Sequence, residues 1–151
     1  MHVGALVDTV ARLVRRSLPE TLRLDIDVDV GELPLWTWID ATLLEQALVN
    51  LVLNARDATG PDGRIVLRAR RVRIDAAEAA PLQLSAGDCV RIEVEDDGSG
   101  MDADTLAHLF DPFFTTKQPG SGTGLGMAVV YGFVKQSGGA IDVRSAPGRG
   151  T

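Results

Sequence analysis

The chain has 151 residues, of which 45% are hydrophobic, so its length favours one domain with a buried core. Fifteen basic residues against 21 acidic ones give a net charge of −6, which argues against a protein that binds nucleic acid. The single cysteine excludes an internal disulfide, and the chain lacks the apolar run of about 18 residues that a membrane-spanning helix needs. We therefore expect a cytoplasmic location, no membrane contact by this domain and, for the isolated domain, a monomer.

The first elements follow from the spacing of apolar residues. Helical spacing over residues 3–17 predicts a helix that ends at Pro19, and strict alternation over residues 22–30 predicts a half-buried strand. Residues 35–39 are predicted to form a short strand whose two tryptophans pack.

A long helix and two long strands are expected in the middle of the chain. Asp40 is the predicted N-cap of a helix over residues 41–58. Alternation over residues 64–74 predicts a strand whose arginines lie on its solvent-exposed face. Residues 75–88 are predicted to be a loop, and residues 89–97 a further strand.

The last third is expected to contain a short helix over about 103–109, a buried helix over about 123–137 and a strand over 140–145. Residues 1–151 thus form one α+β domain, in which a mixed sheet carries helices on one face. The chain stops at Thr151 directly after a turn, so we expect the last strand of the sheet to be missing.

The long central helix carries two stripes. Its apolar stripe is predicted to face the core and contains Leu44, Ala47, Leu48, Leu51, Ala55 and Ala58. A polar stripe, which is not a solvated face because leucines flank it, contains Gln46, Asn50, Asn54 and Asp57. These groups form either a structural hydrogen-bond network or a site for a hard cation or polar ligand, because amide oxygens can bind Mg²⁺ when phosphates and waters complete the shell.

The stretch EVEDDGSGM places Asp96 and Asp97 at the end of a strand, with Gly98 and Gly100 following. A carboxylate there could accept a hydrogen bond from an exocyclic amine, and residues without a Cβ atom would let a flat ring lie against the backbone. The alternative is an ordinary Asp/Gly turn.

A glycine-rich loop precedes the last predicted helix. Its glycines occupy every second position: Gly120, Gly122, Gly124 and Gly126. The spacing excludes the Walker A loop and the G-x-G-x-x-G fingerprint, and leaves a loop that opens a helix N-terminus suited to an anion. Lys117 could reach a terminal phosphate, or it could be a solvated residue of a lid.

Together these segments resemble the ATP-binding catalytic domain of sensor histidine kinases of the nitrogen-regulation or hybrid-sensor type, in the superfamily of DNA gyrase and MutL. Four family boxes occur in order, namely NLVLNARDA (50–58), DDGSGM (96–101), LFDPFFTTK (109–117) and GSGTGLGM (120–127). The resemblance implies a two-layer α/β sandwich of the Bergerat type that binds ATP between its helices and a flexible lid.

The resemblance also implies roles for individual residues. Asn54 would be the main Mg²⁺ ligand with help from Asn50, Asp96 would accept the adenine amino hydrogen, and Thr151 would help to fix the adenine through water. Asn50, Asn54 and Lys117 would be the catalytic residues. The implied ATP site comprises Asn50, Asn54, Asp57, Asp96, Gly98, Gly100, Met101, Lys117, Gly122, Thr123, Gly124, Leu125, Gly126 and Thr151.

Position 50 indicates which branch of the superfamily this is. ATP-hydrolysing relatives carry a glutamate base there, whereas the amide of Asn50 cannot take a proton at neutral pH. Neither His2 nor His108 lies in a phosphoacceptor box, so we expect transfer of the γ-phosphoryl group to a histidine of a separate dimerisation domain, absent here and preceding residues 1–18. A response regulator would receive the phosphoryl group next. The alternatives are a non-catalytic nucleotide-sensing module and a gyrase-type ATP hydrolase.

Overall fold

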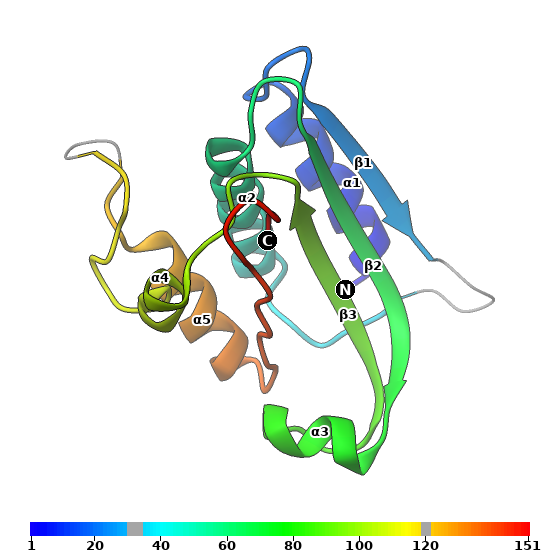
Figure 1. Ribbon diagram of the computed structural model, residues 1–151. Coiled ribbons are helices and arrows are strands. Elements are labelled where there is room, and N and C mark those ends of the chain that lie inside the picture. Colours follow the sequence, from blue (N-terminus) through cyan, green and yellow to red (C-terminus); the bar gives the residue numbers. More distant parts are fainter. Residues whose placement is uncertain (30–34, 119–121) are drawn as a thin grey trace.

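The computed structural model describes residues 1–29, 35–118 and 122–151. In this part of the chain the strands form one sheet in the order β1-β2-β3 (Figure 1). β1 (Arg23–Val28) runs parallel to β2 (Arg64–Ile74), and β2 is antiparallel to β3 (Gly87–Asp96). The predicted mixed sheet is therefore confirmed, and the predicted bounds of β2 match the observed ones.

The two faces of the sheet differ in chemistry, as the alternation of β2 predicts. Ile65 and Leu67 point into the core and are fully buried. The opposite face carries charges that pair across strands, with Arg64 Nε 2.6 Å from Asp25 Oδ2 and Arg68 bound to Glu95. These arginines therefore serve the solvated face of the sheet.

Two helices cover the apolar face. In Figure 1 α1 (Val3–Arg15) lies behind β1 and β2, and α2 (Ala41–Ala58) lies to the left of β3. The buried residues of both helices form one cluster with those of the strands. The predicted N-cap of α2 is confirmed, because the Asp40 carboxylate accepts from the amides of Thr42 and Leu43. The buried stripe of α2 contains Leu44, Ala47, Leu48, Val52 and Ala55, so Val52 takes the core position expected for Leu51.

The remaining helices lie beside or beyond this core. α5 (Gly126–Gln136) packs on α2, and α4 (Ala103–His108) lies next to it (Figure 1). α5 begins three residues later than predicted and is only partly buried, since Val129 is 53% exposed. No helix in the described ranges is long and apolar enough to cross a membrane.

Three predictions about secondary structure were wrong. The expected loop at 75–88 contains the helix α3 (Ala76–Leu82), which begins with a reciprocal capping box between Asp75 and Glu78. Residues 140–145, all described, form no strand, because they make no ladder hydrogen bonds with β3.

The third error concerns residues 35–39. They contribute a single bridge, between Trp36 and His2, rather than a strand. The two tryptophans do not pack in the interior, since Trp36 is 63% and Trp38 is 101% exposed.

Candidate functional site

The acidic turn after β3 places one carboxylate in a buried position. Asp96 is 8% exposed, and its Oδ1 accepts a hydrogen bond from the Gly98 amide at 2.9 Å. Burial raises the pKa of Asp96 above its usual value, although hydrogen bonds from the backbone of Gly98 and Thr151 partly oppose this. The Asp96 backbone also exchanges two hydrogen bonds with Thr151, at 2.9 and 3.2 Å. Asp96 and Thr151 therefore form a directly opposed antiparallel pair.

The glycines of this turn are required by close packing of the backbone itself. A Cβ atom on Gly98 would lie 2.5 Å from the Ala58 carbonyl oxygen at the end of α2. A Cβ atom on Gly100 would lie 1.9 Å from the Ala146 carbonyl oxygen, and Gly100 also has a φ of +65°. Contacts within the protein thus already explain both glycines, which the sequence argument assigned either to a flat ligand or to an ordinary Asp/Gly turn.

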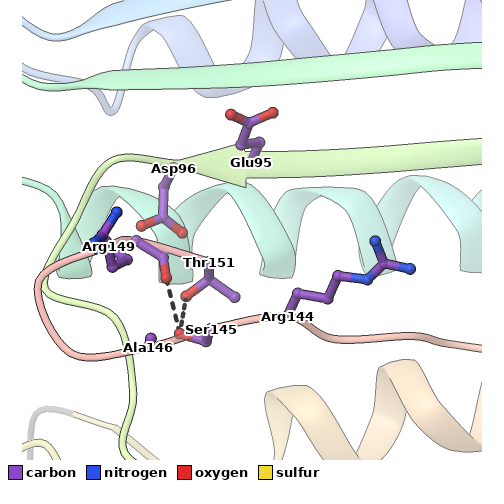
Figure 2. Close-up of a pocket in the computed structure, with 8 residues that line it drawn as sticks. Glu95, Asp96, Arg144, Ser145, Ala146, Arg149 and Thr151 are labelled. Atoms are coloured by element: carbon purple, nitrogen blue, oxygen red, sulfur yellow. Dashed lines mark hydrogen bonds between the residues drawn. The ribbon is translucent and has the colours of Figure 1, made fainter.

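Ser145 joins this turn to the end of the chain. Its Oγ accepts from the Met101 amide at 2.8 Å, donates to the Gly150 carbonyl at 2.9 Å and lies 3.0 Å from Thr151 Oγ1. Figure 2 shows Ser145 below Asp96 and Thr151, and all three line one surface pocket. Sequence analysis missed Ser145, because no motif or spacing marks a residue whose bonding partner, Met101, lies 44 positions away.

The polar stripe of α2 borders the start of α5. Asn50 and Asn54 are half-buried, whereas Gln46 and Asp57 are exposed, so the stripe is more open than the sequence argument assumed. Asn50 faces the first residue of α5, because a Cβ atom on Gly126 would lie 3.8 Å from the Asn50 amide carbon.

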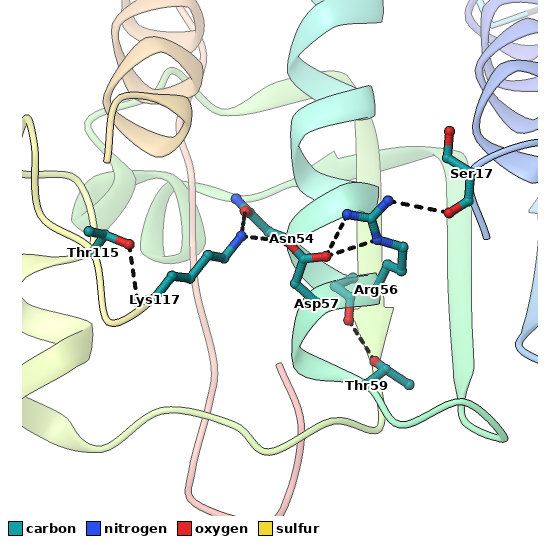
Figure 3. A network of polar contacts seen from close by, with 8 residues as sticks. Ser17, Asn54, Arg56, Asp57, Thr59, Thr115 and Lys117 are labelled. Carbon is teal, nitrogen blue, oxygen red and sulfur yellow. Dashed lines mark hydrogen bonds and ion pairs between the residues drawn. The ribbon is translucent and has the colours of Figure 1, made fainter. Parts of the chain in front are cut away.

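Lys117 reaches the polar stripe from the loop before α5. Its Nζ lies 2.6 Å from Asp57 Oδ2 and 3.3 Å from Asn54 Oδ1, as Figure 3 shows. Arg56 binds the other oxygen of the Asp57 carboxylate at 2.6 Å. Although burial raises the pKa of Asp57, hydrogen bonds from Lys117 and Arg56 outweigh it and lower that pKa. The sequence left open whether Lys117 is solvated, and the structure places it in an ion pair.

The loop that leads into α5 is tied to the preceding segment by its backbone. The Phe113 amide donates to the Gly124 carbonyl at 2.9 Å, and both residues have positive φ, +69° and +65°. Leu125 caps α5 without a side-chain hydrogen bond, and among the residues that the structure describes no side chain accepts from the first amides of the helix. Thr123 Oγ1 accepts from the Leu125 amide at 3.3 Å, and Gly122 lies over the Lys117 side chain. Gly120 lies outside the described residues.

The acidic turn after β3 and the polar stripe of α2 lie close together along α2. Gly98 packs against the Ala58 carbonyl, and Ala58 follows Asn54 by one helical turn, about 6 Å at 1.5 Å per residue. The structure thus brings the acidic turn, the amide stripe and Lys117 to the same end of α2. These are the residues that the sequence predicted to act together.

The amide oxygens on α2 are suitable ligands for a hard cation that keeps some ligands of its own. In residues 1–29, 35–118 and 122–151 no three His, Cys, Asp or Glu side chains converge as a metal site would require. The Asn54 amide oxygen nevertheless faces a cation, the ammonium group of Lys117. Amide oxygens with few carboxylates fit Mg²⁺ that keeps phosphate oxygens and waters as its other ligands.

Known proteins resemble this chain in sequence. Residues 39–151 match the family described as histidine kinase-, DNA gyrase B- and HSP90-like ATPases. The sensor kinase CckA of Brucella abortus (strain 2308) is 46% identical over 145 residues, which are 93% of this chain but 14% of CckA. The chain therefore spans a small part of that relative.

Solved structures share the fold. The catalytic domain of the histidine kinase ThkA, in a nucleotide-free form, superposes with a TM-score of 0.69 at 25% identity, covering 91% of this chain and 79% of that one. Full-length ShkA in complex with AMPPNP superposes with a TM-score of 0.73 at 26% identity, covering 99% of this chain and 28% of ShkA.

Proposed function

Because this chain belongs to the family of histidine kinase-, DNA gyrase B- and HSP90-like ATPases, we propose that it is the ATP-binding catalytic domain of a two-component sensor histidine kinase. One observation carries the proposal: the buried carboxylate of Asp96 and the amide side chain of Asn54 lie at the same end of α2. The Asn54 oxygen there contacts the ammonium group of Lys117. The name of CckA as a sensor kinase and the AMPPNP complex of ShkA support the same assignment.

The base of the nucleotide belongs at the acidic turn. Asp96 uses one carboxylate oxygen for the Gly98 amide, which leaves the other oxygen as an acceptor for the adenine amino group. Thr151, opposite Asp96 in the backbone pair, contributes its hydroxyl beside this carboxylate. Gly98, Gly100 and Met101 continue the acidic turn from Asp96, and Met101 is held there by its amide hydrogen bond to Ser145.

The phosphates belong between the amide stripe and the start of α5. Asn54 and Asn50 supply amide oxygens for Mg²⁺, which when bound neutralises charge on the phosphate oxygens. The first amides of α5 have no side-chain cap from the described residues and suit an anion; Thr123, Gly124, Leu125 and Gly126 form this end of the site.

Lys117 changes partner when the metal and nucleotide bind. Its ammonium group occupies the Asn54 oxygen that the metal needs, and two cations do not share one amide oxygen at this distance. Lys117 would therefore leave Asn54 and meet the γ-phosphate, while Asp57, which now binds Lys117, would remain a partner for its ammonium group.

The reaction is phosphoryl transfer rather than hydrolysis. Asn50 has no basic atom to take a proton from water, so the site positions ATP without activating a water molecule. An imidazole nitrogen from a dimerisation domain of the same kinase attacks the γ-phosphorus, the bond to the β,γ-bridging oxygen breaks, and ADP departs as the imidazole loses its proton. The phosphoryl group then passes to a response regulator.

Calorimetric titration of the chain with ATP, with Mg²⁺ and with a chelator, tests this proposal. We expect binding that strengthens with Mg²⁺ and no steady release of inorganic phosphate. Phosphate release proportional to protein would favour a hydrolase, and absence of ATP binding would refute the nucleotide site. Fusion to a histidine-bearing dimerisation domain should then yield acid-labile protein phosphate.

A further inference from the structure

The hydroxyl of Ser145 has more hydrogen-bond neighbours than it has protons. A serine hydroxyl offers one proton and two lone pairs. The Met101 amide can only donate, so it takes one lone pair of Ser145 Oγ at 2.8 Å. The Gly150 carbonyl can only accept, so it takes the single proton at 2.9 Å. One lone pair remains, and the nearest group to it is Thr151 Oγ1 at 3.0 Å.

This count assigns the proton between the two hydroxyls. Ser145 has already donated its proton to Gly150, so in the Ser145–Thr151 bond the donor is Thr151. The Thr151 hydroxyl then has no proton left for any other partner and offers only lone pairs. A neighbouring ligand therefore meets an acceptor at this position.

The turn that carries Gly150, the acceptor of the Ser145 proton, packs closely against the acidic turn. A Cβ atom on Gly150 would lie 1.9 Å from the Asp96 carbonyl oxygen, and the backbone of Gly100 touches Ala146 equally closely. The Gly148 amide also donates to the Ser99 carbonyl at 2.7 Å. The turn that carries Gly150 is thus fixed against the acidic turn.

The Thr151 hydroxyl stands beside a second acceptor. Asp96 and Thr151 are a hydrogen-bonded antiparallel pair, so their side chains project from the same face of the sheet. Both line the pocket in Figure 2. The Asp96 carboxylate accepts hydrogen bonds and donates none. The wall of the pocket thus presents two neighbouring acceptors.

We propose that Ser145 is a positioning residue that tunes the base specificity of this site, because it consumes the Thr151 proton and leaves two neighbouring acceptors, Asp96 and Thr151, in a wall that Arg144 and Arg149 also line. This inference rests on the proposed nucleotide site. Such a wall suits a purine that presents an amino group, as adenine does at its 6-position. Guanine presents a carbonyl oxygen there, so two acceptors would face a third without a proton between them.

Substitution of Ser145 separates this role from simple support of the fold. Ser145→Ala frees the Thr151 proton, which can then turn into the pocket and donate to a carbonyl. We expect the ratio of GTP to ATP dissociation constants to fall by about three- to tenfold, the value of one neutral hydrogen bond. Ser145→Thr keeps the hydroxyl and should keep the ratio of the unchanged chain. Calorimetry with ATP and GTP in Mg²⁺ measures these ratios, and circular dichroism checks folding.

A second pair of variants applies if Ser145→Ala does not fold. Thr151→Val removes the second acceptor and should lower the ratio, whereas Thr151→Ser should preserve it. Equal weakening of both nucleotides, with an unchanged ratio in Ser145→Ala or in Thr151→Val, would overturn the specificity role while leaving the nucleotide site intact. Failure of the unchanged chain to bind ATP would refute the proposed function itself, and the role of Ser145 with it.

Discussion

Replacement of Asp96 by asparagine changes one atom at the point where the base is expected to bind. The new side chain keeps an oxygen that can accept from the Gly98 amide, as Oδ1 does now at 2.9 Å. The second carboxylate oxygen becomes an NH₂ group, which donates and cannot accept from an amino group. Asp96→Asn should therefore remove one charge-assisted hydrogen bond to adenine and leave the turn in place.

The size of this effect follows from the energy of such a bond. A hydrogen bond to a charged group contributes about 1.5–3 kcal/mol. At about 1.4 kcal/mol per tenfold change, the dissociation constant for ATP should rise by about 10- to 150-fold.

The free energy of unfolding of Asp96→Asn should not fall, in contrast to its affinity for ATP. Burial raises the pKa of Asp96 in the folded protein above the 3.8 of the free side chain, so ionisation of this group opposes folding. This cost is present in full above the folded pKa and vanishes as the pH falls below the unfolded value. Asn carries no such cost, so Asp96→Asn should be at least as stable as the unchanged chain at pH 7. Weaker ATP binding then cannot be attributed to unfolding.

Asp97→Asn is the matched control. The Asp97 carboxylate is exposed and accepts from the Arg64 amide at 2.8 Å, a role that an Asn oxygen also fills. Its effect on ATP binding should stay within about twofold, as for most surface substitutions. Calorimetric titration of both variants with Mg-ATP, with urea denaturation alongside, measures both quantities. Unchanged affinity in Asp96→Asn would refute the reasoning and move the adenine contact elsewhere.

Three further substitutions test the surroundings of the site. Gly124→Ala should weaken ATP binding, because the new Cβ atom would lie 2.4 Å from the backbone of Phe113 and break the contact that holds the start of α5. Calorimetry measures the affinity for ATP, and unaltered binding would argue against a role for that contact. Asp40→Ala should lower the free energy of unfolding by about 1 kcal/mol through loss of the N-cap of α2, measured by urea denaturation with ATP affinity as the control. Asp111→Asn should lower the pKa of His108 towards 6.5, since the hydrogen bond that the His108 ring donates to the Asp111 carboxylate raises it. The stability that this pair adds is present below pH 6.5 and lost as the pH rises through the folded pKa. NMR titration of the ring measures the shift, and an unchanged pKa would contradict the pairing.

Some features were predictable because their cause is local. Alternation of Ile65, Leu67 and Ala69 with charged neighbours defines β2, since successive side chains of a strand point to opposite faces. Asp40 marks the start of α2 because a carboxylate can satisfy amides two and three residues later. The helix α3 also had a local signal, the spacing of Asp75 and Glu78, which was not recognised.

The rest depended on partners that lie far away along the chain. Residues 140–145 alternate like a strand but form none, because alternation does not by itself bring a segment into hydrogen-bonding register with a neighbouring strand. Trp36 and Trp38 look like core residues and are exposed, because nothing in residues 35–39 indicates which face the core will take.

The sequence by itself determined α1, α2, α4, α5, the three strands of the sheet and the identity of the polar residues on α2 and at the acidic turn. Only the tertiary structure decided how they meet: Lys117 with Asp57 across 60 residues, and Ser145 with Met101 across 44. It also showed that Gly98 and Gly100 are demanded by the backbone of Ala58 and Ala146. Periodicity and capping act within a few residues and can be read locally, whereas the direction of a hydroxyl proton depends on every donor and acceptor that the fold brings around it.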